Sequence, residues 1–219
     1  YSEAASQITA VLEDHWNPQT RCFMANTALG AGAEYKQTDL DTAVILSVLH
    51  THRMVGPHSV TDDRIMATAH ALELTFQRIY PINASGLSAP AIGRYEGDVY
   101  YGGNPWYLTT AAMAQYYYLL AKVINSGATI ETTGHNRAVW QALVPGVAVG
   151  THLHLAKPVG LKALQALRQR ADSYMATLER FTPSTGNMSE QFHLATGAPV
   201  SAENLTWSYA SFLTAITAR

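Results

Sequence analysis

The chain has 219 residues, 47% of them hydrophobic, and a formal net charge of -2. Charged residues make up only 14%, against roughly 25% in an average globular protein, and this composition suits an extracellular protein better than a cytosolic one. The chain has no basic run, so neither nucleic acid nor an anionic membrane is expected as a partner. Its longest apolar stretches, such as residues 110–123, are broken by polar residues and are too short to span a bilayer.

Helical periodicity runs through almost the whole chain. It predicts helices near residues 2–16, 39–52, 61–80, 105–125, 135–144, 158–181 and 202–218. No segment shows the sustained alternation that a strand needs. Long helices in series, joined by alternately short and long loops, predict an all-α protein of stacked helical hairpins. The odd number of helices, none of which looks like a cap, indicates that the architecture is incomplete.

Capping residues mark several of the predicted helix starts. Asn104 followed by Pro105 is typical of an N-cap and the first position of a helix. Acidic residues at 62–63 and at Glu203 are expected in first turns, where the helix dipole favours negative charge.

The stretch from Ile82 to Gly103 is the most irregular part of the chain. It contains five glycines, one proline and three tyrosines. Loops of this length are usually functional or disordered, and the tyrosines argue against disorder. We therefore expect an ordered, functional loop.

This loop and the residues just after it carry the groups that a sugar site needs. Tyr100 and Trp106 offer flat aromatic faces for the apolar side of a pyranose ring, and Arg94 and Asp98 offer charged groups for its hydroxyls. A purely structural interpretation is equally compatible with the composition. In that interpretation Arg94 and Asp98 form an ion pair that pins the loop over packed tyrosines.

Glu190 lies on the loop before the last predicted helix. It follows a glycine-containing turn and stands beside an amide and an aromatic residue. A carboxylate on a loop at the mouth of a helical scaffold is well placed to activate water as a general base. Spacing alone favours an ordinary exposed loop glutamate over a general base. In the helix that follows, Trp207 is the one residue expected to line a site, and the others are expected to pack in the core.

Three glycosylation sequons begin at Asn83, Asn187 and Asn204, and they favour secretion and a glycoprotein. Cys22 is the single cysteine, so the chain can form no internal disulfide, and its apolar neighbours favour a buried thiol.

Two pairs of histidines have a spacing that resembles pairs of metal ligands. They are His50 with His52 and His152 with His154, and no further motif completes a zinc site around either pair. Neither a metal nor a cofactor is therefore expected.

Two segments together resemble fungal glucoamylases, the family 15 glycoside hydrolases. One is Gly93-Arg-Tyr-x-x-Asp-x-Tyr-x-x-x-Asn-Pro-Trp-x-Leu108, and the other is Met188-Ser-Glu-Gln-Phe192 with Ser201-Ala-x-x-Leu-Thr-Trp-Ser-Tyr-Ala210. Weaker similarity spans nearly the whole chain. The resemblance implies an (α/α)6 barrel, a toroid of six helical hairpins, of which this chain supplies about half of the helices. Residues 1–219 are then the C-terminal part of a single catalytic domain, with no separate starch-binding domain.

The resemblance also implies an activity. The family's enzymes release β-glucose from the non-reducing ends of starch and maltooligosaccharides by inversion. Glu190 resembles the general base, and Arg94 resembles the arginine that binds substrate hydroxyls in the first subsite. Tyr100 and Trp106 resemble aromatic residues that line the glucose pocket, and Asp98 resembles a carboxylate that supports the loop.

The chain departs from the family pattern in three places. Glu96-Gly97 stands where the family has Pro-Glu, and His193 stands where an aspartate is usual. The Trp-Glu-Glu-like motif of the family's general acid is absent, so the acid is expected on an N-terminal half outside this chain. The alternatives are a non-catalytic glucan-binding protein that has lost the acid, or an α,α-barrel of another activity, such as a trehalase-like hydrolase or a terpenoid-type cyclase.

Overall fold

The computed structural model describes residues 2–27, 36 and 38–219, and these residues form a largely helical structure. The α-helices of this described part are α1 (Ser2–Leu12), α2 (Ala43–Thr51), α3 (Asp63–Ile79), α4 (Tyr107–Asn125), α5 (Arg137–Leu143), α6 (Pro158–Phe181) and α7 (Thr206–Ala218). The strands form two-residue antiparallel pairs, β1 (Trp16–Asn17) with β2 (Cys22–Phe23), β3 (Ile130–Glu131) with β4 (His152–Leu153), and β5 (Gln191–Phe192) with β6 (Pro199–Val200). The predicted all-α class and the positions of the seven helices are confirmed.

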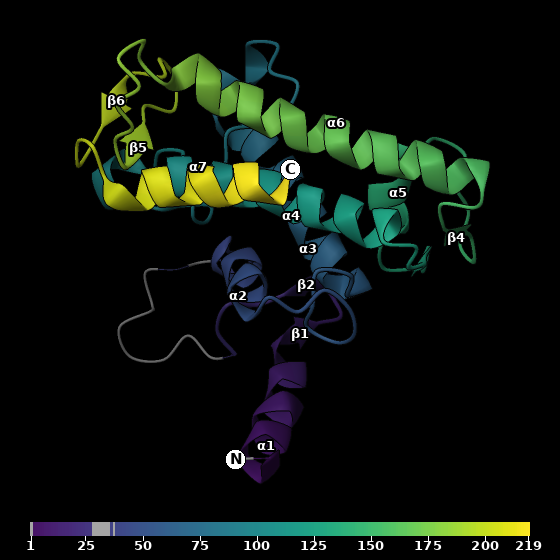
Figure 1. Cartoon of the computed structure of the whole chain (residues 1–219). Coiled ribbons are helices and arrows are strands. Elements are labelled where there is room, and N and C mark those ends of the chain that lie inside the picture. Colours follow the sequence, from purple (N-terminus) through teal and green to yellow (C-terminus); the bar gives the residue numbers. More distant parts are fainter. Residues whose placement is uncertain (1, 28–35, 37) are drawn as a thin grey trace.

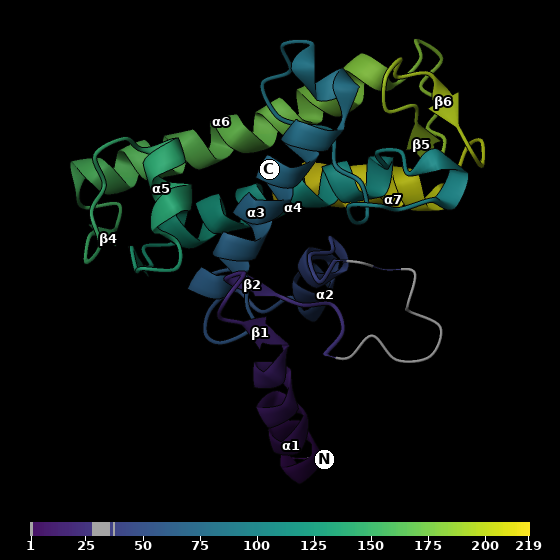
Figure 2. The same cartoon turned by 180° about the vertical axis from the view of Figure 1, so that it is seen from behind.

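Helix α4 is the centre of the molecule. Fifteen of its nineteen residues are buried, and a helix that is apolar on all sides is expected inside a core. It packs against α6 and α7, and it also contacts α2. Figures 1 and 2 show α4 and α7 alongside α6, with α2 beneath them, while α3 crosses α4, behind it in Figure 1 and in front of it in Figure 2. Both views place β5 and β6 at the end of the molecule where α7 begins.

Helix α1 extends away from this body, and none of its residues is buried (Figures 1 and 2). Its base is tied to the start of α3, where Arg64 donates to the Glu13 carboxylate at 2.7 and 3.2 Å. The helix ends at Leu12, short of the predicted residue 16, because the chain continues into a 3₁₀ turn and the β1–β2 hairpin. Across the described ranges, no helix is long and apolar enough to cross a membrane.

The predicted start of α4 at Asn104-Pro105 is wrong by two residues. Trp106 is extended, with φ -113° and ψ 145°, and the helix begins at Tyr107 without a side-chain cap. Asn104 instead accepts a hydrogen bond from Leu194 N at 3.0 Å, and its Nδ2 lies 3.2 Å from Gln191 Oε1. The Asn104 side chain, which the sequence assigns to a helix cap, therefore makes its hydrogen bonds with a distant segment instead.

The acids at the start of α3 behave as predicted, whereas those before α7 do not. Asp62 is the N-cap of α3, since its Oδ1 accepts from Arg64 N at 2.9 Å, and Asp63 lies in the first turn. Helix α7 begins only at Thr206, so Glu203 lies in the exposed loop that precedes it. Ser201, at the predicted start, takes part in a different interaction described below.

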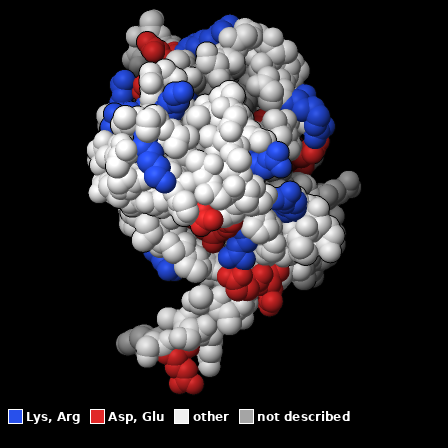
Figure 3. Space-filling model, turned by 90° about the vertical axis from the view of Figure 1, so that its right-hand side faces the viewer, with Lys and Arg blue, Asp and Glu red and all other residues white. Residues whose placement is uncertain are grey.

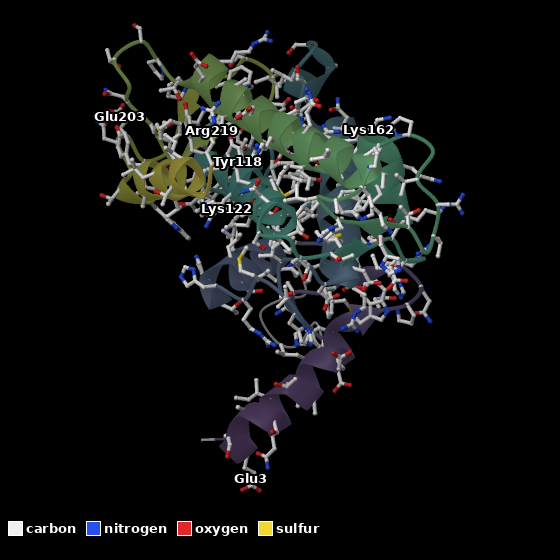
Figure 4. All side chains as sticks on the ribbon, turned by 45° about the vertical axis from the view of Figure 1, so that its right-hand side comes forward. Glu3, Tyr118, Lys122, Lys162, Glu203 and Arg219 are labelled. Atoms are coloured by element: carbon white, nitrogen blue, oxygen red, sulfur yellow. The ribbon has the colours of Figure 1, made fainter. Side chains whose placement is uncertain are left out.

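The C-terminal end of α7 is anchored to its neighbours, and Figure 4 shows Tyr118, Lys122 and Arg219 gathered there. Tyr118 donates to Asp172 Oδ1 at 2.5 Å, and Arg219 Nε lies 3.2 Å from the same oxygen. Lys122 Nζ donates to Thr217 O at 3.0 Å. The surface seen in Figure 3 is largely uncharged, with charges of both signs scattered over it.

Candidate active site

The loop that precedes α4 is organised around an ion pair between Arg94 and Asp98. Arg94 donates from Nε to Asp98 Oδ2 at 2.7 Å and from Nη2 to Oδ1 at 2.6 Å, a bidentate contact. The Asp98 side chain is almost fully buried, while that of Arg94 is 34% exposed. Hydrogen bonding to Asp98 is the main reason that the pKa of Arg94 is raised. The pinning interaction that sequence left open is therefore present, and it leaves Arg94 partly exposed.

Glycine is required at two points of this loop. Gly103 has φ +69°, and a Cβ there would lie 2.0 Å from Asp98 O. A Cβ on Gly93 would lie 1.9 Å from the Tyr80 hydroxyl. Both approaches are too close for any side chain, so these glycines let the backbone close tightly around Arg94 and Asp98.

Aromatic rings surround the exposed guanidinium. The Arg94 Cζ lies 5.0 Å from the centre of the Tyr100 ring and 5.1 Å from that of Trp106. The two rings are 5.8 Å apart and tilted by 31°. Tyr100 is 42% exposed and Trp106 only 5%. Trp106 therefore lies on the buried side of the guanidinium, and Tyr100 lies on the side open to solvent. An arginine set among aromatic faces offers both the polar and the apolar contacts that a sugar ring needs.

Arg94, Asp98, Tyr100 and Trp106 form what we call the Arg94 cluster. The loop that carries Glu190, the Glu190 loop, is joined to this cluster through the backbone. Trp106 and Gln191 form an antiparallel bridge, and Tyr107 N donates to Glu190 O at 3.3 Å. Glu190 is thus one residue from the partner of Trp106, whose ring contacts Arg94. The structure therefore brings together Arg94 and Asp98, Tyr100, Trp106 and Glu190, which sequence placed in two segments far apart.

Two neighbours hold one oxygen of the half-buried Glu190 carboxylate. Ser201 Oγ donates to Oε2, and Gln191 Nε2 donates to the same atom at 3.3 Å. Among the described residues no hydrogen bond reaches Oε1, so this oxygen is left to contact solvent or substrate.

Sequence reasoning did not identify Ser201 as a site residue, because its position looked like a helix start. Its positive φ of 66° is uncommon for a non-glycine residue. No simple pattern in the sequence indicates this conformation. A residue distant in sequence fixes the backbone next to Ser201, since Glu190 N donates to Ala202 O at 2.8 Å.

Trp207 lies in the first turn of α7 and is 51% exposed. Its helix is joined to the Glu190 loop by Ser208, whose Oγ donates to Ser189 O at 2.7 Å. The structure therefore places Trp207 near this loop but outside the Arg94 cluster.

The two local departures from the family pattern have clear structural partners. Glu96 accepts from Arg78 Nη2 at 2.8 and 3.0 Å, on the side of the loop that faces the end of α3. His193 Nδ1 accepts from Ala195 N at 3.2 Å and Thr196 N at 3.3 Å. The imidazole thus accepts two backbone hydrogen bonds in the β5–β6 turn, as an aspartate can.

Of the three sequons, the structure argues against the one at Asn83. The residue is 2% exposed, and its Nδ2, the atom that would carry a glycan, donates to Phe76 O at 2.9 Å and Ala91 O at 3.0 Å. A glycan at Asn83 is incompatible with this fold, which corrects the prediction. Asn187 and Asn204 are exposed.

Neither histidine pair forms a metal site in the part of the chain described. His50 lies within α2, whereas His52 ends that helix in a left-handed conformation. His152 is in β4, and His154 Nδ1 accepts from Ala156 N at 3.0 Å. No group of three or more histidine, cysteine, aspartate or glutamate side chains is suitably placed within the described ranges.

Comparison with known sequences adds to this geometry. The family model for Glycosyl hydrolases family 15 matches residues 1–217. Glucoamylase-1 of Arthroderma benhamiae is 35% identical over 217 residues, which cover 92% of this chain and 35% of that protein. Glucoamylase-1 of Schizophyllum commune is 32% identical over 225 residues, which cover 100% of this chain and 38% of that protein.

A solved structure gives the same result for the fold. The glycoside hydrolase family 15 glucoamylase from Hypocrea jecorina superposes with a TM-score of 0.90 at 32% identity, over 100% of this chain and 37% of that one. The helices are therefore part of an (α/α)6 barrel, as expected. The chain spans less than two fifths of the length of these relatives.

Proposed function

The chain belongs to glycosyl hydrolase family 15, and from that membership we propose that it is the C-terminal part of a secreted glucoamylase. The proposed reaction is exo-acting, inverting hydrolysis of α-1,4 and, more slowly, α-1,6 glucosidic bonds. It releases β-glucose from the non-reducing ends of starch and maltooligosaccharides. The observation that carries the proposal is the attachment of the Glu190 loop to the Arg94 cluster through the Trp106–Gln191 bridge.

Glu190 is the proposed general base. Ser201 and Gln191 hold Oε2, and Oε1 takes a proton from a water molecule as the water oxygen attacks the anomeric carbon. The proton stays on the carboxyl group while the glycosidic bond breaks, and the configuration at the anomeric carbon is inverted. Arg94, Tyr100 and Trp106 bind the sugar ring, and Asp98 keeps the guanidinium in place.

The leaving oxygen must receive a proton from a second carboxyl group, about 6.5–9.5 Å from the base in an inverting enzyme. Nothing in this chain resembles the family's acid motif, and Glu96 is engaged by Arg78. We therefore propose that the N-terminal half of the domain supplies the acid. We call this chain, together with the region that supplies the rest of the barrel, the complete protein.

The deciding variant is Glu190→Gln in the complete protein, assayed by glucose release from soluble starch. Loss of a general base is expected to lower kcat by roughly 10²–10⁴-fold. Glu203→Gln is the matched control, because Glu203 is an exposed glutamate on the loop before α7 (Figure 4). Near-full kcat in Glu190→Gln refutes the assignment of the base. A wild-type protein that binds maltooligosaccharides without hydrolysing them identifies a non-catalytic glucan-binding protein instead.

Secretion and glycosylation are part of the same proposal. Two exposed sequons, at Asn187 and Asn204, support it, together with the low content of charged residues. Endoglycosidase treatment of the protein from its native source is expected to reduce its mass, with the carbohydrate mapped to one or both of these asparagines.

A further inference from the structure

The segment that leads into α2 lies directly behind Arg94. Thr42 N donates to Arg94 O at 2.9 Å, and Thr42 Oγ1 donates to Gly93 O at 2.8 Å. Asp41 and Tyr95 form an antiparallel bridge. Three successive residues of the Arg94 loop are therefore fixed by two residues at the start of α2.

Asp41 also forms a buried ion pair with Lys36. Lys36 Nζ lies 2.5 Å from Asp41 Oδ2, and the two side chains are only 8% and 12% exposed. The other oxygen of Asp41 accepts from Ala43 N at 2.8 Å, at the first residue of α2. Desolvating two charges is costly, so a buried pair is weak support for a purely stabilising role.

The pair shares an aromatic ring with Arg94. Lys36 Nζ lies 5.0 Å from the centre of the Tyr95 ring, and Arg94 Cζ lies 5.5 Å from the same centre. Hydrogen bonding to Asp98 raises the pKa of Arg94 most strongly, and the negative charges of Asp98 and, less strongly, of Asp41 raise it further. Two cations, each paired with its own carboxylate, therefore lie over the same ring, and the charge of Asp41 acts on Arg94.

This arrangement makes Asp41 a competitor for the guanidinium of Arg94. While Lys36 neutralises Asp41, Arg94 remains on Asp98 with its Nη1 free of any described hydrogen bond and its neighbours Tyr100 and Trp106 in place. Without Lys36, the uncompensated Asp41 carboxylate attracts the guanidinium away from Asp98. Without the charge on Asp41, the buried ammonium of Lys36 repels it.

We propose that Lys36 and Asp41 are positioning residues that hold the guanidinium of Arg94 against Asp98, with its free N–H groups toward a bound sugar. Neither residue touches substrate. This inference rests on the proposed function, since it assumes that Arg94 binds the non-reducing end of a glucan.

The test compares KM and kcat for maltooligosaccharide hydrolysis in variants of the complete protein. Lys36→Met and Asp41→Asn are each expected to raise KM about tenfold with kcat within about twofold, because a misplaced charge-assisted contact loses binding shared by ground and transition states. Lys36→Arg keeps the pair and is expected to keep KM. Arg78→Met is the matched control, since it removes the exposed Arg78–Glu96 pair of the same loop.

The double variant Lys36→Met/Asp41→Asn separates positioning from plain structural support. It removes both charges but keeps an oxygen for Ala43 N, so KM is expected to return to within about threefold of wild type. A KM in the double variant that is as high as in the single variants, or higher, refutes the electrostatic role. If Lys36→Met does not fold, Asp41→Asn and the double variant give the same comparison.

The outcomes also separate this inference from the proposed function. A wild-type complete protein that releases no glucose refutes the proposed function, whether or not it binds maltotriose. An active wild-type enzyme whose folded single variants keep an unchanged KM refutes only the positioning role of Lys36 and Asp41.

Discussion

The hydrogen bonds of the buried Asn83 side chain are expected to stabilise the loop that carries Arg94. This side chain makes hydrogen bonds with three backbone groups, donating to Phe76 O and Ala91 O at 2.9 and 3.0 Å and accepting from Ala91 N at 2.8 Å. These bonds connect the C-terminal part of α3 to the residues just before Gly93. In turn, Ile92 O accepts from Trp106 N at 2.9 Å, so Asn83 supports the backbone on both sides of Arg94, at residue 91 and, through Ile92, at Trp106.

The perturbation is Asn83→Asp in the complete protein. Aspartate keeps the oxygen that faces Ala91 N but replaces the double donor, so two buried carbonyl oxygens lose their partner and face another oxygen. At about 1–3 kcal/mol for each buried group left unsatisfied, the free energy of unfolding is expected to fall by about 3–5 kcal/mol. Urea unfolding measures this change, and an unchanged m-value shows that the two-state comparison holds.

Ser85→Ala is the control, because it destroys the same sequon while leaving Asn83 in place. Only the Ser85 Oγ bond to Ile82 O at 2.6 Å is lost, so we expect a decrease of about 1 kcal/mol and no change in carbohydrate mass. A loss below about 1 kcal/mol in Asn83→Asp, or a glycan found on Asn83 in the folded protein, would falsify the reasoning.

Two further predictions concern Ser201 and Cys22. Ser201→Ala removes the hydroxyl that donates to Glu190 Oε2. Because Glu190 is only partly buried, water replaces the bond in part, and kcat/KM is expected to fall only about two- to fivefold. A fall as large as that of Glu190→Gln contradicts this account. Burial raises the pKa of the Cys22 thiol to about 11, so its reaction with a disulfide reagent at pH 8 is expected to be about a hundredfold slower in the native protein than in urea. Equal reaction rates in the native and unfolded states would show that the thiol is accessible. Because the folded protein keeps this thiol protonated, its contribution to the free energy of unfolding is full below about pH 9 and is lost as the pH rises toward 11.

The sequence by itself determined the helical class, the positions of the helices and the residues of the two motifs. Helical periodicity is a local property, since residues three and four apart share a face. It therefore located even α4, although that helix is apolar on nearly every side. The N-cap at Asp62 was also local, because the bond from Arg64 N joins residues two positions apart.

Only the tertiary structure decided what the polar groups around the site do. Asn104 was assigned to a cap by sequence, yet its side chain bonds to a segment some 90 residues away along the chain. Ser201 looked like a helix start and instead holds Glu190, and Asn83 looked like a glycan site and instead fastens the loop. Each of these side chains has alternative partners, and the choice depends on which distant backbone groups the packed helices leave without one.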